Sequence, residues 1–114
     1  MSKLARVMAQ EEGYYVAGSV PNRDNNPLDL RHSPNASHAG EGANDIGEIP
    51  TPEEGWADAE RQLQIYASRQ MTLRQMVYTL APPTENDSER YLDFVCSSMG
   101  MGPDTLVSDA LAVA

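Results

Sequence analysis

The chain has 114 residues, enough for one modest hydrophobic core and too few for two, so we expect a single domain over residues 1–114. Its 17 acidic residues outnumber the 8 basic ones and give a net charge of -9 at pH 7. This charge argues against nucleic acid as a partner, because phosphate binding needs a basic surface. The single cysteine, Cys96, excludes an intramolecular disulfide.

The N-terminal segment has the spacing of an amphipathic helix. Leu4, Val7 and Met8 recur at helical intervals, and Gly13 is a natural stop, so a helix is predicted over about residues 2–12. The segment contains no long apolar run, and we therefore expect neither a signal peptide nor a membrane span.

Residues 13–50 are rich in residue types that interrupt regular structure. Proline, asparagine and glycine recur throughout this segment, which predicts a long and mostly irregular loop. Loops of this length are uncommon in a compact domain and are often functional. Short strand pairs have room within it, for instance around residues 45–49.

The second half of the chain is predicted to be helical. Helix starts and stops are marked by capping residues, prolines and a glycine, at Thr51-Pro52, Thr72, Pro82-Pro83, residues 86–89 and Gly100. Apolar residues repeat at helical spacing between these marks, at Trp56, Ala59, Leu63 and Tyr66, at Leu73, Met76, Val77 and Leu80, and at Tyr91, Leu92, Phe94, Val95, Cys96 and Met99. An apolar tail follows Pro103. This layout predicts a mainly α domain with a long irregular loop after its first helix.

Two glutamates, Glu11 and Glu12, end the first predicted helix directly before Gly13. A carboxyl group acts as a general acid near neutral pH only if it stays protonated, which burial against apolar walls achieves by penalising the charged form. Helical angles place Glu11 at the centre of the apolar stripe and Glu12 at its edge, so either would project into a cleft beside the helix. The alternative is that both are solvated charges, although acidic residues at this end oppose the helix dipole.

The loop from residues 23 to 32 holds a second group of candidates. The amides of Asn25 and Asn26 suit sugar hydroxyls, or else brace a tight turn by bonding its backbone. Asp24 or Asp29 would supply a second carboxylate that stabilises an oxocarbenium-like transition state or activates water.

Other side chains have weaker chemical signals. Tyr14 and Tyr15 follow the two glutamates and would either stack on a sugar face or pack in the core. His32 and His38 stand in no metal-ligand pattern, so we predict neither a metal site nor a cofactor. Cys96 has no convincing histidine partner, which favours a buried apolar role over a nucleophilic one.

Several blocks of the chain, taken in order, resemble the pattern of a known family. They are MAQEEGYYVAGS at 8–19, RDNNP at 23–27, IPTPEEGW at 49–56, LQIY at 63–66, MTL at 71–73 and APPTENDS at 81–88. With this order the chain resembles, over nearly its whole length, small phage and prophage proteins described as virion structural proteins or lysozyme-like cell-wall hydrolases. The usual pattern of that family runs from an acidic residue plus glycine to an asparagine-asparagine-proline-glycine-asparagine-leucine loop.

The resemblance implies a lysozyme-like fold that cleaves the β-1,4 bond between the amino sugars of peptidoglycan, as a muramidase or a lytic transglycosylase. Glu12, directly before glycine, would be the general acid, as in phage-type lysozymes. In the glutamate-serine-glycine register of lytic transglycosylases, Glu11 would take that role instead. The implied partners are glycan strands of peptidoglycan and other virion proteins, in the virion or in the host cytoplasm with delivery to the cell wall.

The chain departs from the family pattern after Pro27, where Leu28 and Asp29 replace glycine and asparagine. Leucine adopts a positive φ only at a cost, so either the turn differs or the loop is repurposed. The charge of -9 also opposes long-range approach to an anionic cell wall. Two alternatives therefore stand beside a glycosidase: a catalytically inactive virion structural protein that keeps the fold, and a module that binds glycan without cutting it.

Overall fold

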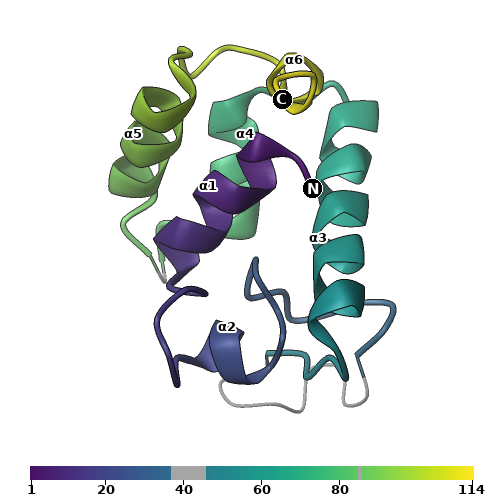
Figure 1. Cartoon of the computed structure of the whole chain (residues 1–114). Coiled ribbons are helices and arrows are strands. Elements are labelled where there is room, and N and C mark those ends of the chain that lie inside the picture. Colours follow the sequence, from purple (N-terminus) through teal and green to yellow (C-terminus); the bar gives the residue numbers. More distant parts are fainter. Residues whose placement is uncertain (37–45, 85) are drawn as a thin grey trace.

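The computed structural model describes residues 1–36, 46–84 and 86–114, and more than half of these residues lie in helices (Figure 1). The helices of this part are α1 (Lys3–Glu12), α2 (Val20–Arg23), α3 (Pro52–Ser68), α4 (Leu73–Leu80), α5 (Ser88–Met99) and α6 (Val107–Leu111). The described residues form no β structure beyond isolated bridges, such as that between Thr72 and Leu106. The mainly α prediction is confirmed. No helix of this part has the length and apolar character needed to cross a membrane.

Helix α1 begins and ends where the sequence predicts. The Ser2 hydroxyl accepts a hydrogen bond from the Ala5 amide at 3.1 Å and caps the first turn. Gly13 ends the helix at a φ of 83°, a left-handed conformation that glycine adopts without strain. The apolar face is buried, and α1 lies between α5 and α3, which it contacts on either side (Figure 1). Glu12, the last helical residue, is thereby held at the edge of the core.

The predicted boundaries of the later helices are confirmed. Thr51 caps α3, Thr72 and Gln75 form a reciprocal capping box on α4, and Asp87 caps α5, which ends at Gly100. The tail after Pro103, predicted only as apolar, contains the short helix α6. It buries Val107 and Ala110 and packs against α3 and α1.

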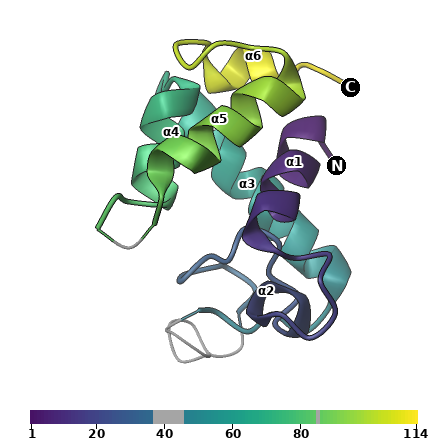
Figure 2. The same ribbon diagram turned by 90° about the vertical axis from the view of Figure 1, so that its left-hand side faces the viewer.

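The long loop after α1 is less irregular than predicted, because it contains α2. The Ser19 hydroxyl accepts a hydrogen bond from the Asn22 amide, and Pro21 lies in the first turn, where a helix does not need its amide hydrogen. Figure 2 shows α2 and the surrounding loops at the end of the molecule opposite α6.

The strand pairing expected around residues 45–49 is only partly present. Asp45 lies outside the described residues. Residues 46–49 run beside the loop that follows α2, with the Gly47 amide 3.0 Å from the Leu30 carbonyl and the Ile49 amide 2.8 Å from the Asp24 carbonyl. These two bonds tie the two segments together without forming a strand.

One cluster of buried side chains joins the helices to the loop. Leu28 and Leu30 of the loop belong to it, together with Leu4, Val7, Met8, Ala59, Leu63, Tyr66, Leu73, Met76, Val77, Tyr91, Leu92, Val95, Met99, Val107 and Ala110. Trp56, expected on the same apolar stripe as Leu63, packs against the edge of the cluster. The loop is therefore anchored to the core by its own apolar residues, which fixes the polar residues between them.

Candidate functional site

The two asparagines predicted as substrate contacts hydrogen-bond within the loop itself. Asn26 is 1% exposed, and its side chain accepts a hydrogen bond from the Leu30 amide at 2.9 Å. The Asn26 side-chain nitrogen, Nδ2, donates to the carbonyls of Leu30 and Gly47, at 2.7 and 2.9 Å. Asn25 donates to the Ile49 carbonyl at 2.9 Å. In this arrangement both amides brace the loop, which was the alternative to a contact with sugar.

The turn at Leu28 and Asp29 has a simple physical explanation. The left-handed residues are Asn25, at a φ of 52°, and Asp29, at 55°, and both residue types tolerate this region better than leucine does. Leu28 has no positive φ and is buried in the core cluster. Leu28 therefore carries no left-handed backbone strain, and Asp29 takes the left-handed position after it.

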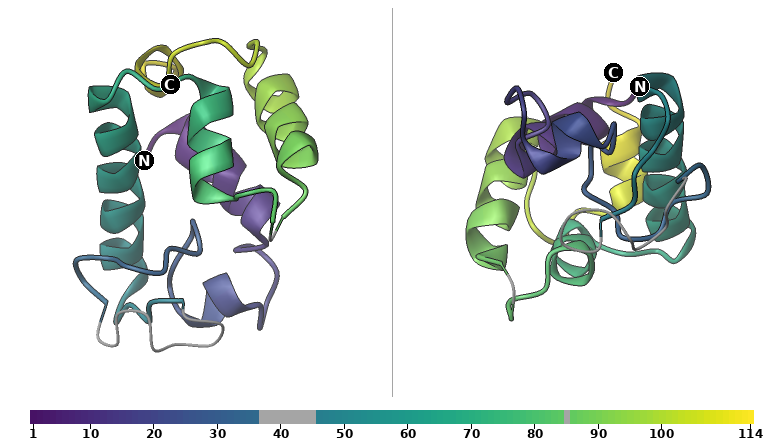
Figure 3. Two further views of the ribbon diagram at one scale, coloured as in Figure 1. Left: turned by 180° about the vertical axis from the view of Figure 1, so that it is seen from behind. Right: turned by 90° about the horizontal axis from the view of Figure 1, so that it is seen from below.

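Glu12 lines a cavity of about 290 Å³ between the end of α1, the loop and the α4–α5 connection. The other described residues of its wall are Leu28, Asp29, Arg31, Ile46, Leu80, Ala81 and Asn86. Figure 3 (left) shows the loop after α2, drawn in blue, rising toward the lower end of α4. From α5, the buried Tyr91 hydroxyl donates a hydrogen bond to Glu12 Oε2 at 2.9 Å. The sequence-distant Tyr91 therefore fixes the Glu12 carboxyl group in the cavity wall.

The cavity pairs two carboxyl groups with different proton affinities. Burial raises the pKa of Glu12 to about 8; the Tyr91 hydrogen bond opposes this shift, and the charges of Asp29 and Glu11 add to it. Burial also raises the pKa of Asp29 to about 6, with repulsion from Asp24 adding to the shift and Arg31 opposing it. At pH 7 Glu12 is mostly protonated while Asp29 is mostly ionised, which is the protonation pattern of an acid and a stabilising carboxylate.

The structure separates this pair from the neighbouring acidic candidates. Glu11 is half-buried and is not part of the cavity wall. Asp24 is 8% exposed, lies outside the wall, and keeps its buried Oδ2 without a hydrogen-bond donor. Asp29 also has a buried oxygen, Oδ1, without a hydrogen-bond donor. Unlike Asp24, however, Asp29 is part of the cavity wall. Of the two aspartates considered as a second carboxylate, Asp29 is therefore the one placed beside Glu12.

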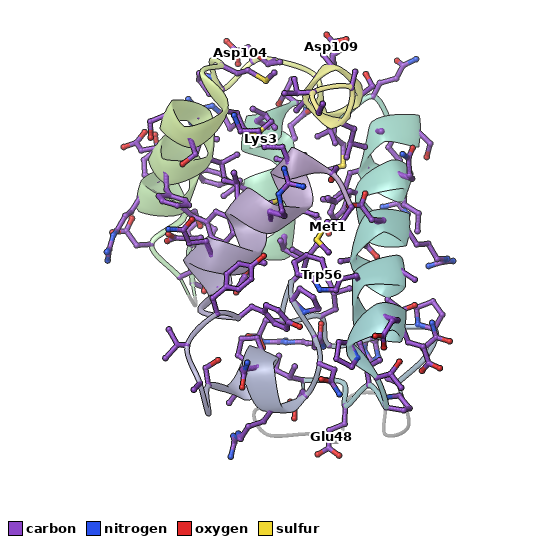
Figure 4. The ribbon with its side chains drawn as sticks, in the orientation of Figure 1. Met1, Lys3, Glu48, Trp56, Asp104 and Asp109 are labelled. Atoms are coloured by element: carbon purple, nitrogen blue, oxygen red, sulfur yellow. The ribbon has the colours of Figure 1, made fainter. Side chains whose placement is uncertain are left out.

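Tyr14 and Tyr15 lie elsewhere, in an aromatic cluster with Trp56. The ring centroid of Tyr14 lies 5.3 Å from that of Tyr15 and 5.2 Å from that of Trp56, and both pairs are edge-to-face. Figure 4 shows Trp56 in front, between α1 and α3 and below Met1. None of the three aromatic residues belongs to the wall of the Glu12 cavity.

Sequence reasoning missed Tyr91, Arg31 and Asn86 as residues of the site. Tyr91 was expected only as a buried residue of its helix, and nothing local indicates that it reaches a carboxyl group 79 positions away. Asn86 was predicted only as part of a helix start. The described residues contain no group of three or more His, Cys, Asp or Glu that could hold a metal ion, and His38 lies outside them.

Comparison of the chain with protein-family models, with curated proteins and with solved structures found no match. Its function must therefore be inferred from the chemistry of its own residues. Among these, Glu12 and Asp29 are the informative pair, because they share one cavity and differ in protonation at neutral pH.

Proposed function

We propose that this chain is a glycosidase of phage origin that cleaves peptidoglycan glycan strands, with Glu12 as the general acid. The observation that carries the proposal is the cavity in which a buried glutamic acid with a pKa of about 8 faces the same space as Asp29, with a pKa of about 6. Acid-assisted cleavage of a glycosidic bond needs one protonated carboxyl group and benefits from a second, ionised one.

The hydrogen bond to Glu12 indicates which of its two carboxyl oxygens carries the proton. Tyr91 donates to Oε2, so the acidic proton belongs on Oε1. In the proposed step this proton moves to the glycosidic oxygen as the bond from that oxygen to the sugar C1 breaks, and the leaving sugar departs with a hydroxyl group. Positive charge develops on C1 and the ring oxygen, where the Asp29 carboxylate would stabilise it.

Two outcomes complete this step. Water adds to C1 in a hydrolase, and a hydroxyl group of the same sugar adds to C1 in a lytic transglycosylase. In both, the attacking oxygen loses a proton to Glu12, which restores the acid. The proposal covers both outcomes, since they share the roles of Glu12 and Asp29.

Three further parts of the proposal rest on the resemblance of the ordered sequence blocks to phage lysozyme-like proteins. They are the peptidoglycan substrate, the phage origin and a lysozyme-like arrangement of the helices. The blocks include residues around Glu12 and the start of the loop that carries Asp29. A protein of this kind would act from the virion, or from the host cytoplasm after delivery to the cell wall.

Digestion of purified sacculi tests the proposal. We expect the parent protein to clear a sacculus suspension and Glu12→Gln to lose roughly 100-fold or more of that rate. Glu11→Gln is the matched control, since it makes the same chemical change one residue outside the cavity wall, and it should keep most of the activity. Mass spectrometry of the released muropeptides separates hydrolysis from anhydro-sugar formation.

Undiminished clearing by Glu12→Gln would refute the assignment of the acid. If the parent protein releases no muropeptides and remains bound to purified phage particles, the inactive virion structural protein is the correct alternative. Sedimentation with sacculi without any release of muropeptides would instead identify a glycan-binding module.

A further inference from the structure

A second cavity, of about 390 Å³, adjoins the cavity that holds Glu12. The two cavities share Asp29, Arg31 and Leu80 in their walls. A ligand too large for the 290 Å³ around Glu12 would therefore extend across these three residues into the second space.

Beyond the shared residues, the polar side chains of the second cavity wall are His32, Gln62, Tyr66 and Thr79. Gln62 and the buried Tyr66, both of α3, stand there, and interaction with Gln62 opposes the rise that burial causes in the pKa of Tyr66. Thr79 of α4 donates its hydroxyl hydrogen to the Gln75 carbonyl at 2.7 Å, which leaves its oxygen able to accept. The Gln62 amide offers one acceptor oxygen and two donor hydrogens.

Apolar side chains separate these polar groups. Leu30 from the loop, Leu80 from α4 and Pro82 from the α4–α5 connection lie in the same wall. Neutral donors and acceptors alternating with small apolar surfaces suit a sugar ring, which has hydroxyl groups at its edge and C–H groups on its faces.

Asp29 lies at the junction between the two cavities, as a residue of both walls. A glycan that extends from one cavity into the other would therefore pass this residue.

Building on the proposed function, we propose that the second cavity is a glycan-binding subsite in which Gln62 and Thr79 contact sugar hydroxyls. The substrate is then an extended glycan that runs from Glu12 along the space between α3 and α4, and a disaccharide fills the site only in part. Gln62 and Thr79 act in binding, while bond cleavage stays with Glu12.

Binding of neutral chitooligosaccharides to the Glu12→Gln protein tests this subsite without turnover. We expect the hexasaccharide to bind more tightly than the disaccharide. The double variant Gln62→Ala with Thr79→Val should bind the hexasaccharide roughly tenfold more weakly, because two hydrogen bonds to the sugar are lost. Gln64→Ala, on the exposed side of α3, is the matched control and should leave binding unchanged. Amide chemical shifts establish that each variant remains folded.

Activity on sacculi distinguishes failure of the subsite from failure of the proposed function. In an otherwise wild-type protein, the double variant should raise KM and leave kcat nearly unchanged. If Glu12→Gln abolishes cleavage but the double variant binds the hexasaccharide as tightly as its parent, the subsite is refuted and the proposed function stands. If the parent neither cleaves sacculi nor binds the hexasaccharide, both proposals fall together.

Discussion

At the scale of single residues, burial gives Glu12 and Asp29 opposite protonation states near neutral pH. We therefore predict a bell-shaped pH dependence of sacculus cleavage. Its acidic limb lies near pH 6, where Asp29 gains a proton, and its basic limb lies near pH 8, where Glu12 loses one. Initial rates in buffers of constant ionic strength give the profile. A rate that is flat across this range would be inconsistent with the assigned acid and carboxylate.

The Tyr91 hydroxyl supplies a second prediction, because it donates to Glu12 Oε2 and thereby lowers the pKa of Glu12. Tyr91→Phe removes this stabilisation of the charged form, so the basic limb of the pH profile should move upward by roughly half a unit to one unit. The maximal rate should fall as well, since the carboxyl group loses the contact that positions it. Tyr78→Phe is the matched control, as that hydroxyl donates to Glu89 on the surface. An unmoved basic limb in Tyr91→Phe would argue against this role.

Ionised Glu12 destabilises the fold, which gives a third prediction. Its pKa is about 8 in the folded protein against an ordinary value of 4.5, so the native state holds the proton more tightly and stability falls as pH rises from 4.5 to 8. Glu12→Gln removes the charge and keeps an acceptor for Tyr91. Its free energy of unfolding should exceed that of the parent by about 1–3 kcal/mol above pH 8, and match it near pH 5. Urea unfolding at the two pH values, with Glu11→Gln as control, measures the difference.

At the scale of elements, the longer helices could be predicted because their ends are set by local chemistry. Ser2 and Gly13 bound α1, and Thr72 caps α4, each through contacts within a few residues. The short helices α2 and α6 were missed because their local residues do not indicate a helix. Pro21 and Asn22 are typical of turns, and only burial of Val107 and Ala110 against other helices distinguishes α6 from an apolar tail.

The candidate site could be predicted only in its separate pieces. The resemblance to phage-type lysozymes favoured Glu12, while the helix phase favoured Glu11, and the loop offered both Asp24 and Asp29. Only the fold places Glu12 and Asp29 in one cavity wall. Leu80 and Asn86 carried only the signals of a helix stop and a helix start. They meet Glu12 because α5 packs against both α1 and α4, an arrangement set by long-range contacts that no local pattern encodes.

Gly55, in the first turn of α3, tests how closely the loop packs against this helix. A Cβ atom there would lie 1.8 Å from the Asn25 carbonyl oxygen, so the loop and α3 would have to separate. We predict that Gly55→Ala lowers the free energy of unfolding by at least about 2 kcal/mol and reduces cleavage, because the displaced loop carries Asp29. Gly102→Ala, where a Cβ atom meets nothing within 4 Å, should stay within about 0.5 kcal/mol of the parent. Equal denaturation midpoints for the two variants would contradict this packing.

At the scale of the whole molecule, one core supports the site. The radius of gyration is 13.1 Å, close to the value of about 13 Å expected for a single compact domain of this length. The core cluster runs from Leu4 to Ala110 and includes the loop residues on either side of Asp29. The position of Asp29 relative to Glu12 therefore depends on the packing of the whole chain. The aromatic cluster around Trp56 is separate from the site, since it shares no residue with either cavity wall.

The net charge of -9 also acts at this scale, on the approach to the substrate. Sacculi carry anionic groups, and like charges repel over the Debye length, which shrinks from about 30 Å at 0.01 M to about 8 Å at 0.15 M ionic strength. We predict that the rate at limiting sacculus concentration rises several-fold between these two conditions at pH 7. The cleavage rate of a neutral chitooligosaccharide should stay nearly constant, because it has no charge to repel. A sacculus rate that falls with added salt would show instead that a local attraction, such as that of Arg31 in the cavity wall, outweighs the net charge.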